Sequence, residues 1–440
     1  MVAILLSIAL ATLDTAIANT ALPAIAADLN ASPAASVWII NAYQLAAVAT
    51  LLPLAALGGV IGHRKVYLGG LILFVVASAL CTFSWSLPTL TIARVLQGLG
   101  AAAIMSVNAA LISSIFSYER LGRGLGMNAL VVGTSFAAGP TIASLVLSVA
   151  NWPWLFAINI PIGIFALVFA WNSLPASKAG TLTFDRITAL LNVITFGALI
   201  FALSEATQLG SMTTVMIALG FFVVGGALML KREAGHPAPM FPLDLLKRPM
   251  FALSALTAFC SFATQGLAFV SLPFFFETTL GRDPVQTGFL MTPWSVIVAM
   301  IAPFAGRLSD RYAPGLLGGI GLAILCAGMI SLALMPADAS AWEIGARMVL
   351  CGLGFGFFQA PNQKALMTSA PKNRASGASG TIATARLIGQ ATGAALVALS
   401  FGISSEHGPV LALSIGACFA AVGSIASGLR LVTKHETANG

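Results

Sequence analysis

Runs of about 20 apolar residues follow one another along this chain, and no other feature constrains its fold as strongly. Of its 440 residues, 58% are hydrophobic and only 8% are charged. A soluble domain carries roughly 25% charged residues, so this composition lies outside the soluble range. Because the interior of a bilayer offers the backbone no hydrogen-bond partners, apolar runs of this length cross it as helices. The sequence therefore predicts an all-α integral membrane protein.

Dividing the apolar runs at charged residues and at clusters of proline and glycine predicts about 14 transmembrane helices. The predicted spans cover residues 2–27, 36–61, 66–86, 88–117, 124–149, 153–174, 188–208, 212–230, 251–276, 285–305, 315–336, 343–366, 375–402 and 408–430. Two of the joins, near Leu87 and between Asn151 and Trp154, are short. A count of twelve or thirteen spans stays open at these joins.

The distribution of lysine and arginine orients the predicted helices. With both termini on the cytoplasmic side, 17 of the 21 basic residues fall in inner loops or in the C-terminal tail, and only Arg282 falls in an outer loop. The 17 are Arg64, Lys65, Arg120, Arg123, Lys178, Arg186, Lys231, Arg232, Lys247, Arg248, Arg307, Arg311, Lys364, Lys372, Arg374, Arg430 and Lys434. This positive-inside pattern predicts a multi-pass protein of the bacterial plasma (inner) membrane with cytoplasmic termini. It also accounts for the net charge of +7, so no nucleic-acid partner is expected.

Two segments of the chain repeat one pattern. The first runs from Arg94 through two glycines to Asn108, and the second runs from Arg347 through two glycines to Asn362. In both, the asparagine comes ten residues after the first glycine. In polytopic proteins such repeats accompany two similar helical bundles that flank a site near the bilayer midplane. The alternative is that glycine-rich helices resemble each other by chance.

The repeat predicts how the chain is divided. We expect residues 1–174 to form one six-helix bundle and residues 251–440 to form a second, pseudo-symmetric six-helix bundle. The segment between them, residues 175–250, has no counterpart in the repeat. We expect it to form an inserted transmembrane hairpin with flanking cytoplasmic loops.

Charged residues inside the predicted spans are candidates for a functional site, because a charge at bilayer depth is costly and normally faces a cavity or a partner. Asp14 lies in the first span and Arg94 in the fourth. Asp14 could exchange protons or pair with a cationic ligand, and the alternative is a structural ion pair with Arg94. We favour the functional role for Asp14. Arg94 either modulates that carboxylate or locks its own helix.

Polar residues in the spans could line a central path, although each alone is more often a hydrogen-bonding contact between helices. The candidates for such a path are Asn19, Gln44, Asn108, Gln265, Gln359, Asn362, Gln390 and Glu205. Glu205 lies near the outer end of its span, where we favour snorkelling of the carboxylate to the interface.

Four motifs resemble those of the fourteen-span drug:proton antiporter branch of the major facilitator superfamily. Residues 13–23 resemble its first-helix motif, and residues 94–100 resemble the arginine motif of its fourth helix. Residues 135–143 resemble the antiporter motif of its fifth helix, and residues 152–163 the stretch that enters its sixth. The motifs of helices 1, 5 and 6 together are typical of antiporters of this branch.

The resemblance implies a proton-coupled secondary transporter that exports lipophilic, cationic, drug-like compounds by alternating access, which is multidrug efflux and a route to antibiotic resistance. It implies roles in proton coupling for Asp14 and Arg94. It also implies conformational roles for the motif residues Gly62, Arg64, Gly139, Pro140, Gly306, Asp310 and Arg311.

Other functions stay open on the sequence. The same fold could carry one metabolite or siderophore-like solute, including in the direction of uptake. A membrane enzyme or a channel would need catalytic residues clustered at one interface or a ring of like charges in a pore. Neither pattern is present in the sequence, so these classes are less favoured.

The expected partners are a small-molecule substrate, protons and the lipid bilayer. No nucleotide-binding loop occurs, and the cysteines and histidines are scattered, so we expect no enzyme activity, no cofactor and no metal site. We expect a monomer, and the sequence leaves adaptor proteins unspecified.

The loop after the second span departs from the pattern of the family that it resembles. There the family carries an acidic residue and an arginine ahead of the second glycine, whereas this chain has Gly59 and Val60. The corresponding later loop keeps Gly306, Asp310 and Arg311. In the family this loop helps to hold one conformational state, so the resemblance implies that the earlier latch is either weak or differently built.

If the earlier latch is weak, Asp310→Asn should reduce the rate of transport more than any substitution at Gly59. Efflux rates of both variants, measured at equal expression, test this expectation. Comparable losses would mean that the two loops share the work.

Overall fold

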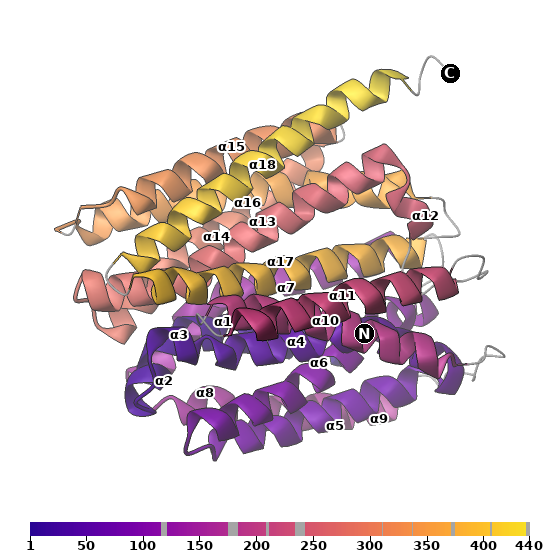
Figure 1. The fold of residues 1–440 in the computed structure, drawn as a ribbon, viewed down its shortest axis with the longest axis horizontal. Coiled ribbons are helices and arrows are strands. Elements are labelled where there is room, and N and C mark those ends of the chain that lie inside the picture. Colours follow the sequence, from indigo (N-terminus) through magenta and orange to yellow (C-terminus); the bar gives the residue numbers. More distant parts are fainter. Residues whose placement is uncertain are drawn as a thin grey trace. The chain divides into compact units, whose positions relative to one another are not determined.

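The protein is helical throughout the part of the chain that the computed structural model describes (Figure 1). That part comprises residues 1–115, 121–174, 184–207, 211–233, 243–309, 311–336, 338–370, 375–404 and 407–436. Within these ranges no residue lies in a β-strand. The predicted all-α class is therefore confirmed.

Contacts between helices divide the chain into two compact units, Met1–Gly139 with Val146–Phe241, and Pro140–Leu145 with Pro242–Gly440. The first contains α1 (Val2–Thr20), α2 (Leu22–Asp28), α3 (Pro33–Ser36), α4 (Trp38–Ile61), α5 (His63–Thr82), α6 (Leu87–Ile115), most of α7 (Leu121–Leu147), α8 (Pro153–Ala157), α9 (Asn159–Ser173), α10 (Arg186–Thr207) and α11 (Met212–Glu233). The second contains α12 (Leu243–Leu246), α13 (Pro249–Phe274), the π-helix η2 (Phe275–Thr279), α14 (Pro284–Leu308), α15 (Pro314–Ala333), α16 (Ala341–Ser369), α17 (Ala375–Ile403) and α18 (Gly408–Glu436).

Each predicted span overlaps one or two of these helices. In the described part of the chain, 12 helices are long and apolar enough to cross a membrane. For α7 and α10 the apolar stretches are shorter, Val131–Leu147 and Arg186–Ala202. Fourteen membrane-spanning helices therefore remain a prediction.

Prolines and side-chain caps set where several helices begin. Several helices, including α2, α3, α8, α13, α14 and α15, have a proline in the first turn, where the backbone N–H that proline lacks would have no helical partner. Asp283 caps α14 by accepting from the backbone N–H of Gln286 at 2.8 Å. Ser340 and Glu343 form a capping box at the start of α16.

Basic side chains bind carbonyl groups at the C-terminal ends of helices. Arg64 donates to a carbonyl oxygen in the last turn of α9 at 2.5 Å. Lys364 donates to the carbonyl of Ser309, directly after α14, at 3.0 Å, and Arg248 donates to that of Ser369, the last residue of α16, at 3.4 Å. Positive charge is favourable at a helix C-terminus, where the last carbonyls lack helical partners. These side chains therefore close three helix ends.

The first glycines of the repeated segments lie at close contacts between helices. A Cβ atom at Gly98 in α6 would lie 2.3 Å from the carbonyl oxygen of Tyr43 in α4. A Cβ atom at Gly352 in α16 would lie 2.5 Å from the carbonyl oxygen of Trp294 in α14. Only glycine permits such an approach of the two backbones.

The second glycines of the repeat behave in the same way. A Cβ atom at Gly100 would lie 2.6 Å from the backbone nitrogen of Phe74 in α5, and one at Gly354 would lie 2.4 Å from that of Leu325 in α15. Within each unit, the repeated helix therefore makes matching contacts with two neighbours. The division into two six-helix bundles and a hairpin remains a prediction.

Helices α10 and α11 lie side by side, and α10 also packs on α4 (Figure 1). The rings of Trp38 and Phe201 form part of that contact, with centroids 6.4 Å apart. Asp185, just before α10, accepts from Arg232 of α11 at 2.9 Å. The hydrogen bond from Arg232 holds the pKa of Asp185 well below its usual range. The basic end of α11 is thereby tied to the start of α10.

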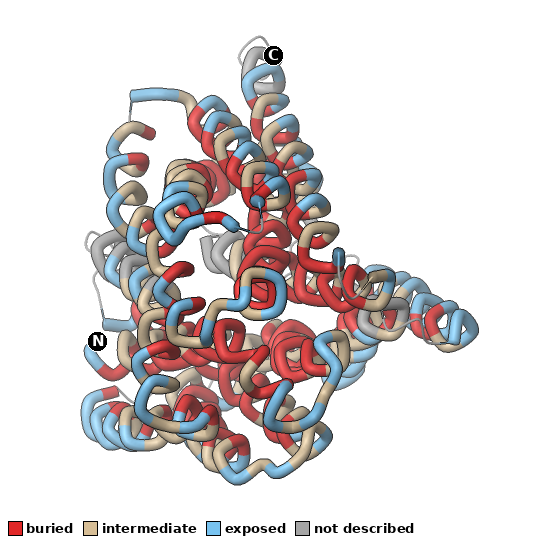
Figure 2. Tube along the Cα trace, turned by 90° about the vertical axis from the view of Figure 1, so that its left-hand side faces the viewer, coloured by how far each residue is buried: buried red, intermediate tan, exposed pale blue. Residues whose placement is uncertain are grey.

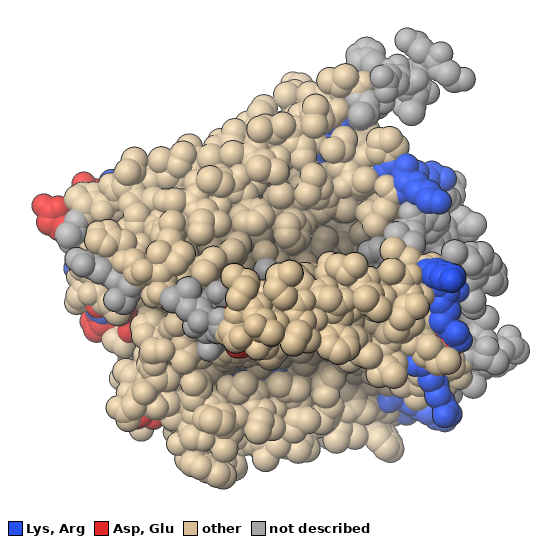
Figure 3. All heavy atoms as spheres, viewed as in Figure 1, with Lys and Arg blue, Asp and Glu red and all other residues tan. Residues whose placement is uncertain are grey.

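Charge and exposure follow the pattern of a membrane protein. Figure 3 shows uncharged surface along the sides of the helices, and single helices end in basic residues, α11 in Lys231 and Arg232 and α14 in Arg307. In Figure 2 buried and exposed residues alternate along single helices. Large apolar side chains of α11, such as Phe221 and Ile217, are more than half exposed. Apolar sides bordered by charged ends match the hydrocarbon layer of a bilayer.

Two glycines of α16 give a matched test of the close packing. Gly354→Ala should lower the free energy of unfolding by about 1–3 kcal/mol, because the new methyl group forces α15 and α16 apart. Gly345→Ala should not destabilise the protein, because a Cβ atom there meets nothing within 4 Å. Thermal unfolding of both purified variants in detergent measures the difference. Equal unfolding temperatures would contradict the packing described for Gly354.

Candidate functional site

Asp14 of α1 is buried, and three side chains donate hydrogen bonds to its carboxylate. Arg94 Nη1 donates to Oδ2 at 2.5 Å, whereas Gln97 Nε2 and Asn159 Nδ2 donate to Oδ1 at 2.9 Å and 2.7 Å. Asp14 and Arg94 are each only 1% exposed. An ionised carboxylate offers about four acceptor positions, so most of those of Asp14 are filled.

The guanidinium of Arg94 is enclosed by acceptors and aromatic rings. Its Nε donates to the carbonyl of Ile39 at 3.2 Å, and its Nη1 donates to Gln97 Oε1 at 2.6 Å as well as to Asp14. Its central carbon lies 4.3 Å from the ring centroid of Tyr43 and 5.6 Å from that of Phe156. Aromatic faces attract a cation, most strongly where water is excluded.

The Asp14–Arg94 pair joins five helices of the first unit. Asp14 comes from α1, Arg94 and Gln97 from α6, Asn159 from α9, and Tyr43 and Ile39 from α4. Helix α5 joins through Ser78, whose Oγ accepts from Gln97 Nε2 at 2.9 Å. A buried ion pair is costly to break, because removing one partner leaves the other charge uncompensated.

Sequence reasoning identified Asp14 and Arg94 and left open an ion pair between them, and the structure has that pair. It did not assign Gln97 or Asn159 to the site. Gln97 could have been found, because a residue three positions after Arg94 lies on the same helix face. Asn159 gave a weaker signal, since it is one of many amide side chains in the spans.

In the second unit, three predicted path residues lie in hydrogen-bonded pairs. Gln390 of α17 donates to Gln265 of α13 at 3.0 Å. Asn362 of α16 donates to the carbonyl of Ser254 at 3.2 Å and accepts from Arg430 at 2.7 Å. These contacts join helices, as amides inside a membrane often do.

Arg430 is a buried residue that sequence reasoning assigned to the C-terminal tail. Helix α18 continues to Glu436, and Arg430 is 1% exposed. Its guanidinium donates to Asn362 Oδ1 and Ser254 Oγ at 2.7 Å and 3.0 Å, and also to Ser427 Oγ. From sequence, an arginine at the end of an apolar run looks like a charge at the membrane surface.

Asn19 of α1 and Gln44 of α4 are buried, at 4% and 2% exposure. In the described part of the chain, Asn19 Oδ1 and Gln44 Oε1 have no hydrogen-bond partner. A buried acceptor without a donor carries a free-energy cost, and in native proteins it calls for water, an ion or a ligand. Both residues were predicted to lie on the substrate path.

The remaining predicted path residues are Asn108 and Glu205 of the first unit and Gln359 of the second. Asn108 donates to Asn128 of α7 at 2.7 Å. Gln359 of α16 and Glu205 of α10 are half-buried. In the described part of the chain, no hydrogen bond joins Asn108 or Glu205 to Asp14 or Arg94.

Two of the predicted motif residues lie where the backbone needs glycine. Gly62 joins α4 directly to α5 with a φ of 101°, a conformation that favours glycine. A Cβ atom at Gly139 of α7 would lie 2.3 Å from the Cβ of Ala16, two residues after Asp14. The antiporter-like motif thus contacts the helix that carries Asp14.

The other motif residues lie at helix ends or within helices. Arg64 closes α9, as described above, and Pro140 lies within α7. Gly306 lies in the last turn of α14, and the exposed Arg311 follows that helix. Asp310 lies outside the described residues.

The described residues hold no group of three or more histidine, cysteine, aspartate or glutamate side chains placed to bind a metal ion. Cys81, Cys260, Cys326, Cys351 and Cys418 are free thiols. The buried charged side chains Asp14 and Arg430 each lie at the centre of a hydrogen-bonded cluster.

The sequence matches a known family over most of its length. The model of the Major Facilitator Superfamily matches residues 4–394. The chain belongs to the major facilitator superfamily. It is accordingly a membrane transporter for a small molecule, not an enzyme, and the family resemblance seen in its motifs is confirmed.

Its relatives are bacterial transporters and resistance proteins. The chain is 48% identical over 437 residues to the uncharacterized transporter YebQ of Escherichia coli (strain K12), covering 99% of this chain and 96% of that protein. It is 29% identical to the riboflavin transporter RibZ of Clostridioides difficile (strain 630), covering 92% and 89%. It is 30% identical to the multidrug resistance protein Stp of Mycobacterium tuberculosis (strain CDC 1551 / Oshkosh), covering 88% and 72%.

The fold is similar to that of solved transporters. The crystal structure of the POT family transporter PepTSo superposes with a TM-score of 0.70, covering 99% of this chain and 98% of that one. Their sequences are 17% identical, so the likeness concerns the fold alone.

Removing one member of the buried pair should destabilise the first unit. Arg94→Gln should lower the free energy of unfolding by about 3–5 kcal/mol, because it leaves the Asp14 carboxylate buried without its cation. Adding Asp14→Asn to this variant should restore part of that loss, since no charge is then buried unpaired. Thermal unfolding of the single and double variants measures both effects. A double variant less stable than Arg94→Gln would contradict the pairing.

Proposed function

We propose that the chain is a proton-coupled secondary transporter that exports lipophilic, cationic, drug-like compounds from the bacterial cytoplasm. The observation that carries the proposal is the buried ion pair of Asp14 and Arg94. Ionisable residues inside a membrane are costly, and those retained there commonly serve proton or substrate movement. The family supports transport by this chain, and the pair supports proton coupling.

The ion pair provides a two-state element that a proton can bias. Protonation of Asp14 removes its negative charge and turns one carboxyl oxygen from an acceptor into a donor. The hydrogen bond from Arg94 then loses its ionic contribution, whereas the guanidinium keeps its charge. The five helices that meet at the pair are released from one arrangement and can adopt another. Alternating access results if the two arrangements open to opposite sides of the membrane.

Coupling follows from competition at Asp14. A cationic substrate favours the ionised carboxylate, and a proton removes that charge. Proton entry at one side therefore releases the substrate there, and proton loss at the other side prepares the next binding. This exchange converts an inward proton gradient into outward movement of substrate.

The unpaired oxygens of Asn19 and Gln44 fit hydrogen-bond donors of a substrate. Asn19 lies in the same helix as Asp14, and Gln44 lies one residue after Tyr43, whose ring faces Arg94. A substrate with N–H groups would supply the donors that these buried oxygens lack. We propose the remaining polar candidates, Asn108, Gln265, Gln359, Asn362, Gln390 and Glu205, as further parts of the path.

A second candidate function is transport of one specific metabolite, including in the direction of uptake. It is supported by the relative named as a riboflavin transporter, which this chain matches over 410 residues. The relative named as a multidrug resistance protein supports the first candidate. Inverted membrane vesicles with an imposed pH gradient, tested with a panel of dyes, antiseptics and metabolites, distinguish the two.

The proposal includes the arrangement in the membrane. We propose a bacterial inner-membrane location with cytoplasmic termini, supported by the alternation of basic residues between predicted loops along the sequence. We propose two pseudo-symmetric six-helix bundles with the hairpin of α10 and α11 outside them, supported by the matching glycine contacts of α6 and α16. We propose that a monomer is the working unit.

The main test is the substitution Asp14→Asn. It keeps the size of the side chain and removes its charge, so the protein should still insert into the membrane, at the lower stability expected when Arg94 is buried without its anion. Proton-driven efflux of a cationic dye should be lost, whereas efflux of neutral compounds should be spared in part. Dye efflux from cells that lack their own pumps, at a fixed pH gradient, provides the measurement.

The matched control is Asp185→Asn, which removes a partly exposed carboxylate of the hairpin. Its efflux should equal that of the parent protein, because its ion pair lies at the surface and contributes little. Full dye efflux by Asp14→Asn at normal expression would disprove the proposed coupling. Glu205 would then be the next carboxylate to test.

A further inference from the structure

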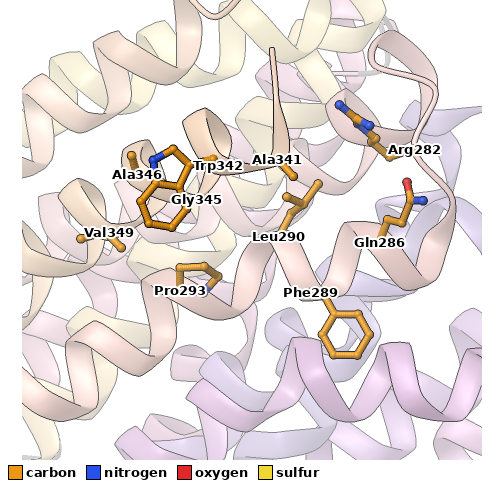
Figure 4. Close-up of a pocket in the computed structure, with 10 residues that line it drawn as sticks. All are labelled: Arg282, Gln286, Phe289, Leu290, Pro293, Ala341, Trp342, Gly345, Ala346 and Val349. Carbon is orange, nitrogen blue, oxygen red and sulfur yellow. The ribbon is translucent and has the colours of Figure 1, made fainter. Parts of the chain in front are cut away.

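A groove open to the surface runs between α14 and α16 of the second unit (Figure 4). Its volume is about 730 Å³. Apart from Arg282 and Gln286, which lie together at one end, its lining side chains are apolar. The lining consists of Arg282, Gln286, Phe289, Leu290, Pro293, Ala341, Trp342, Gly345, Ala346 and Val349.

Small residues on α16 create the hollow. A Cβ atom at Gly345 would meet nothing within 4 Å, and alanines stand at positions 341 and 346 beside it. Phe289 and Trp342 flank the groove and are 47% and 85% exposed. A large exposed tryptophan at the end of a membrane helix is typical of the bilayer interface.

The length of the groove along α16 is close to the thickness of the hydrocarbon layer of one bilayer leaflet. Its lining on α16 extends from Ala341 to Val349, which corresponds to about 12 Å at the helical rise of 1.5 Å per residue. The hydrocarbon core of a bilayer is roughly 30 Å thick, so one leaflet accounts for about 15 Å. The polar end coincides with the starts of α14 and α16. The groove therefore starts where two apolar helices begin, and its length is close to that of one leaflet.

The guanidinium of Arg282 is held at the polar end by the backbone. Gly281 has a φ of 63°, and this turn lets the N–H of Arg282 donate to the carbonyl of Phe276 at 2.9 Å. Arg282 Nη2 donates to the carbonyl of Ala339 at 2.9 Å, which ties it to the start of α16. In the described part of the chain, its Nε is buried and has no hydrogen-bond partner.

Four acidic residues lie near Arg282: Glu277 and Asp338 adjoin Phe276 and Ala339, whose carbonyls accept from Arg282, and the other two are engaged by helix N-termini. Asp283 accepts from the backbone of Gln286, and Glu343 accepts from the backbone of Ser340 at 2.8 Å. Their charges are therefore used in capping α14 and α16. Among the residues that line the groove, Arg282 is the cation.

We propose that this groove holds an acyl chain of a membrane phospholipid, with the phosphate of that lipid bound by Arg282. The lipid belongs to the leaflet at the end where α14 and α16 begin, which is the outer leaflet in the orientation proposed above. Arg282 suits phosphate because its guanidinium is always charged and, with Nη2 engaged by Ala339, can still donate from Nη1. The apolar lining suits the chain, and the length of the groove suits a chain confined to one leaflet.

The experiment uses the purified full-length protein in lipid-free detergent. Phosphatidylglycerol is added, and the molecules bound per protein are counted by native mass spectrometry. A diacylglycerol with the same chains, which lacks the phosphate, is the second probe. The parent protein should bind phosphatidylglycerol about tenfold more tightly, as expected for one charge-assisted hydrogen-bonding contact.

Three variants assign this binding to the groove. Gly345→Leu fills the hollow and should abolish the bound lipid, and Ala346→Leu, on the same wall, serves if the first variant does not fold. Arg282→Gln should remove the preference for phosphatidylglycerol over diacylglycerol. Gly220→Leu is the matched control, because a Cβ atom at this exposed position of α11 also meets nothing within 4 Å. It should bind lipid like the parent protein.

Two results would overturn the proposal. One is equal lipid binding by the parent protein, Gly345→Leu and Ala346→Leu. The other is that a transported dye binds the parent protein and is lost in Gly345→Leu while lipid binding is unchanged, which would assign the groove to a substrate. Neither result depends on proton coupling, since both are measured without a pH gradient.

Discussion

A charged side chain inside a bilayer needs an interaction partner within the protein. The helices of the first unit are arranged around one such interaction, the ion pair of Asp14 and Arg94. The carboxylate of Asp14 needs donors, and they come from α6 and α9. The guanidinium of Arg94 needs acceptors and aromatic faces, and α1 and α4 supply them. Because no single helix can satisfy either charge, these helices must be in place together. The glycines that bring α6 close to α4 and α5 make this proximity possible.

The helices could be predicted from sequence because one physical quantity decides them, namely the length of apolar chain that a bilayer requires. Breaks within the apolar runs were harder to predict. The first predicted span, residues 2–27, is divided into α1 and α2 at Ala21, just before Pro23. The end of α18 was also missed, because Arg430 was counted as a surface charge although its partners on α13 and α16 bury it. Such partners are far away in sequence and leave no local pattern.

The sequence predicts only those residues of the candidate site whose burial in a membrane carries a large free-energy cost. A carboxylate and an arginine in apolar spans are rare and costly, so Asp14 and Arg94 stood out. The amide of Asn159 did not, because many neutral amides lie in these spans and only the fold selects among them. The pairing of Gln265 with Gln390 depends likewise on the packing of α13 against α17. The sequence does not predict the groove beside α16. Two glycines of this helix differ in their surroundings, since a Cβ atom at Gly345 would meet open space and one at Gly354 would meet the backbone of α15.

The basic side chains that close the C-terminal ends of α9, α14 and α16 have a consequence for how this chain can vary. In the proposed orientation, Arg64, Lys364 and Arg248 also belong to the set of basic residues that keeps its loops in the cytoplasm during insertion. The same atoms satisfy carbonyl groups that would otherwise lack partners. Neutralising such a residue to invert the chain in the membrane would also fray a helix end. The same basic residues therefore serve both the orientation of the chain and the termination of helices. A substitution that alters one of these functions also alters the other.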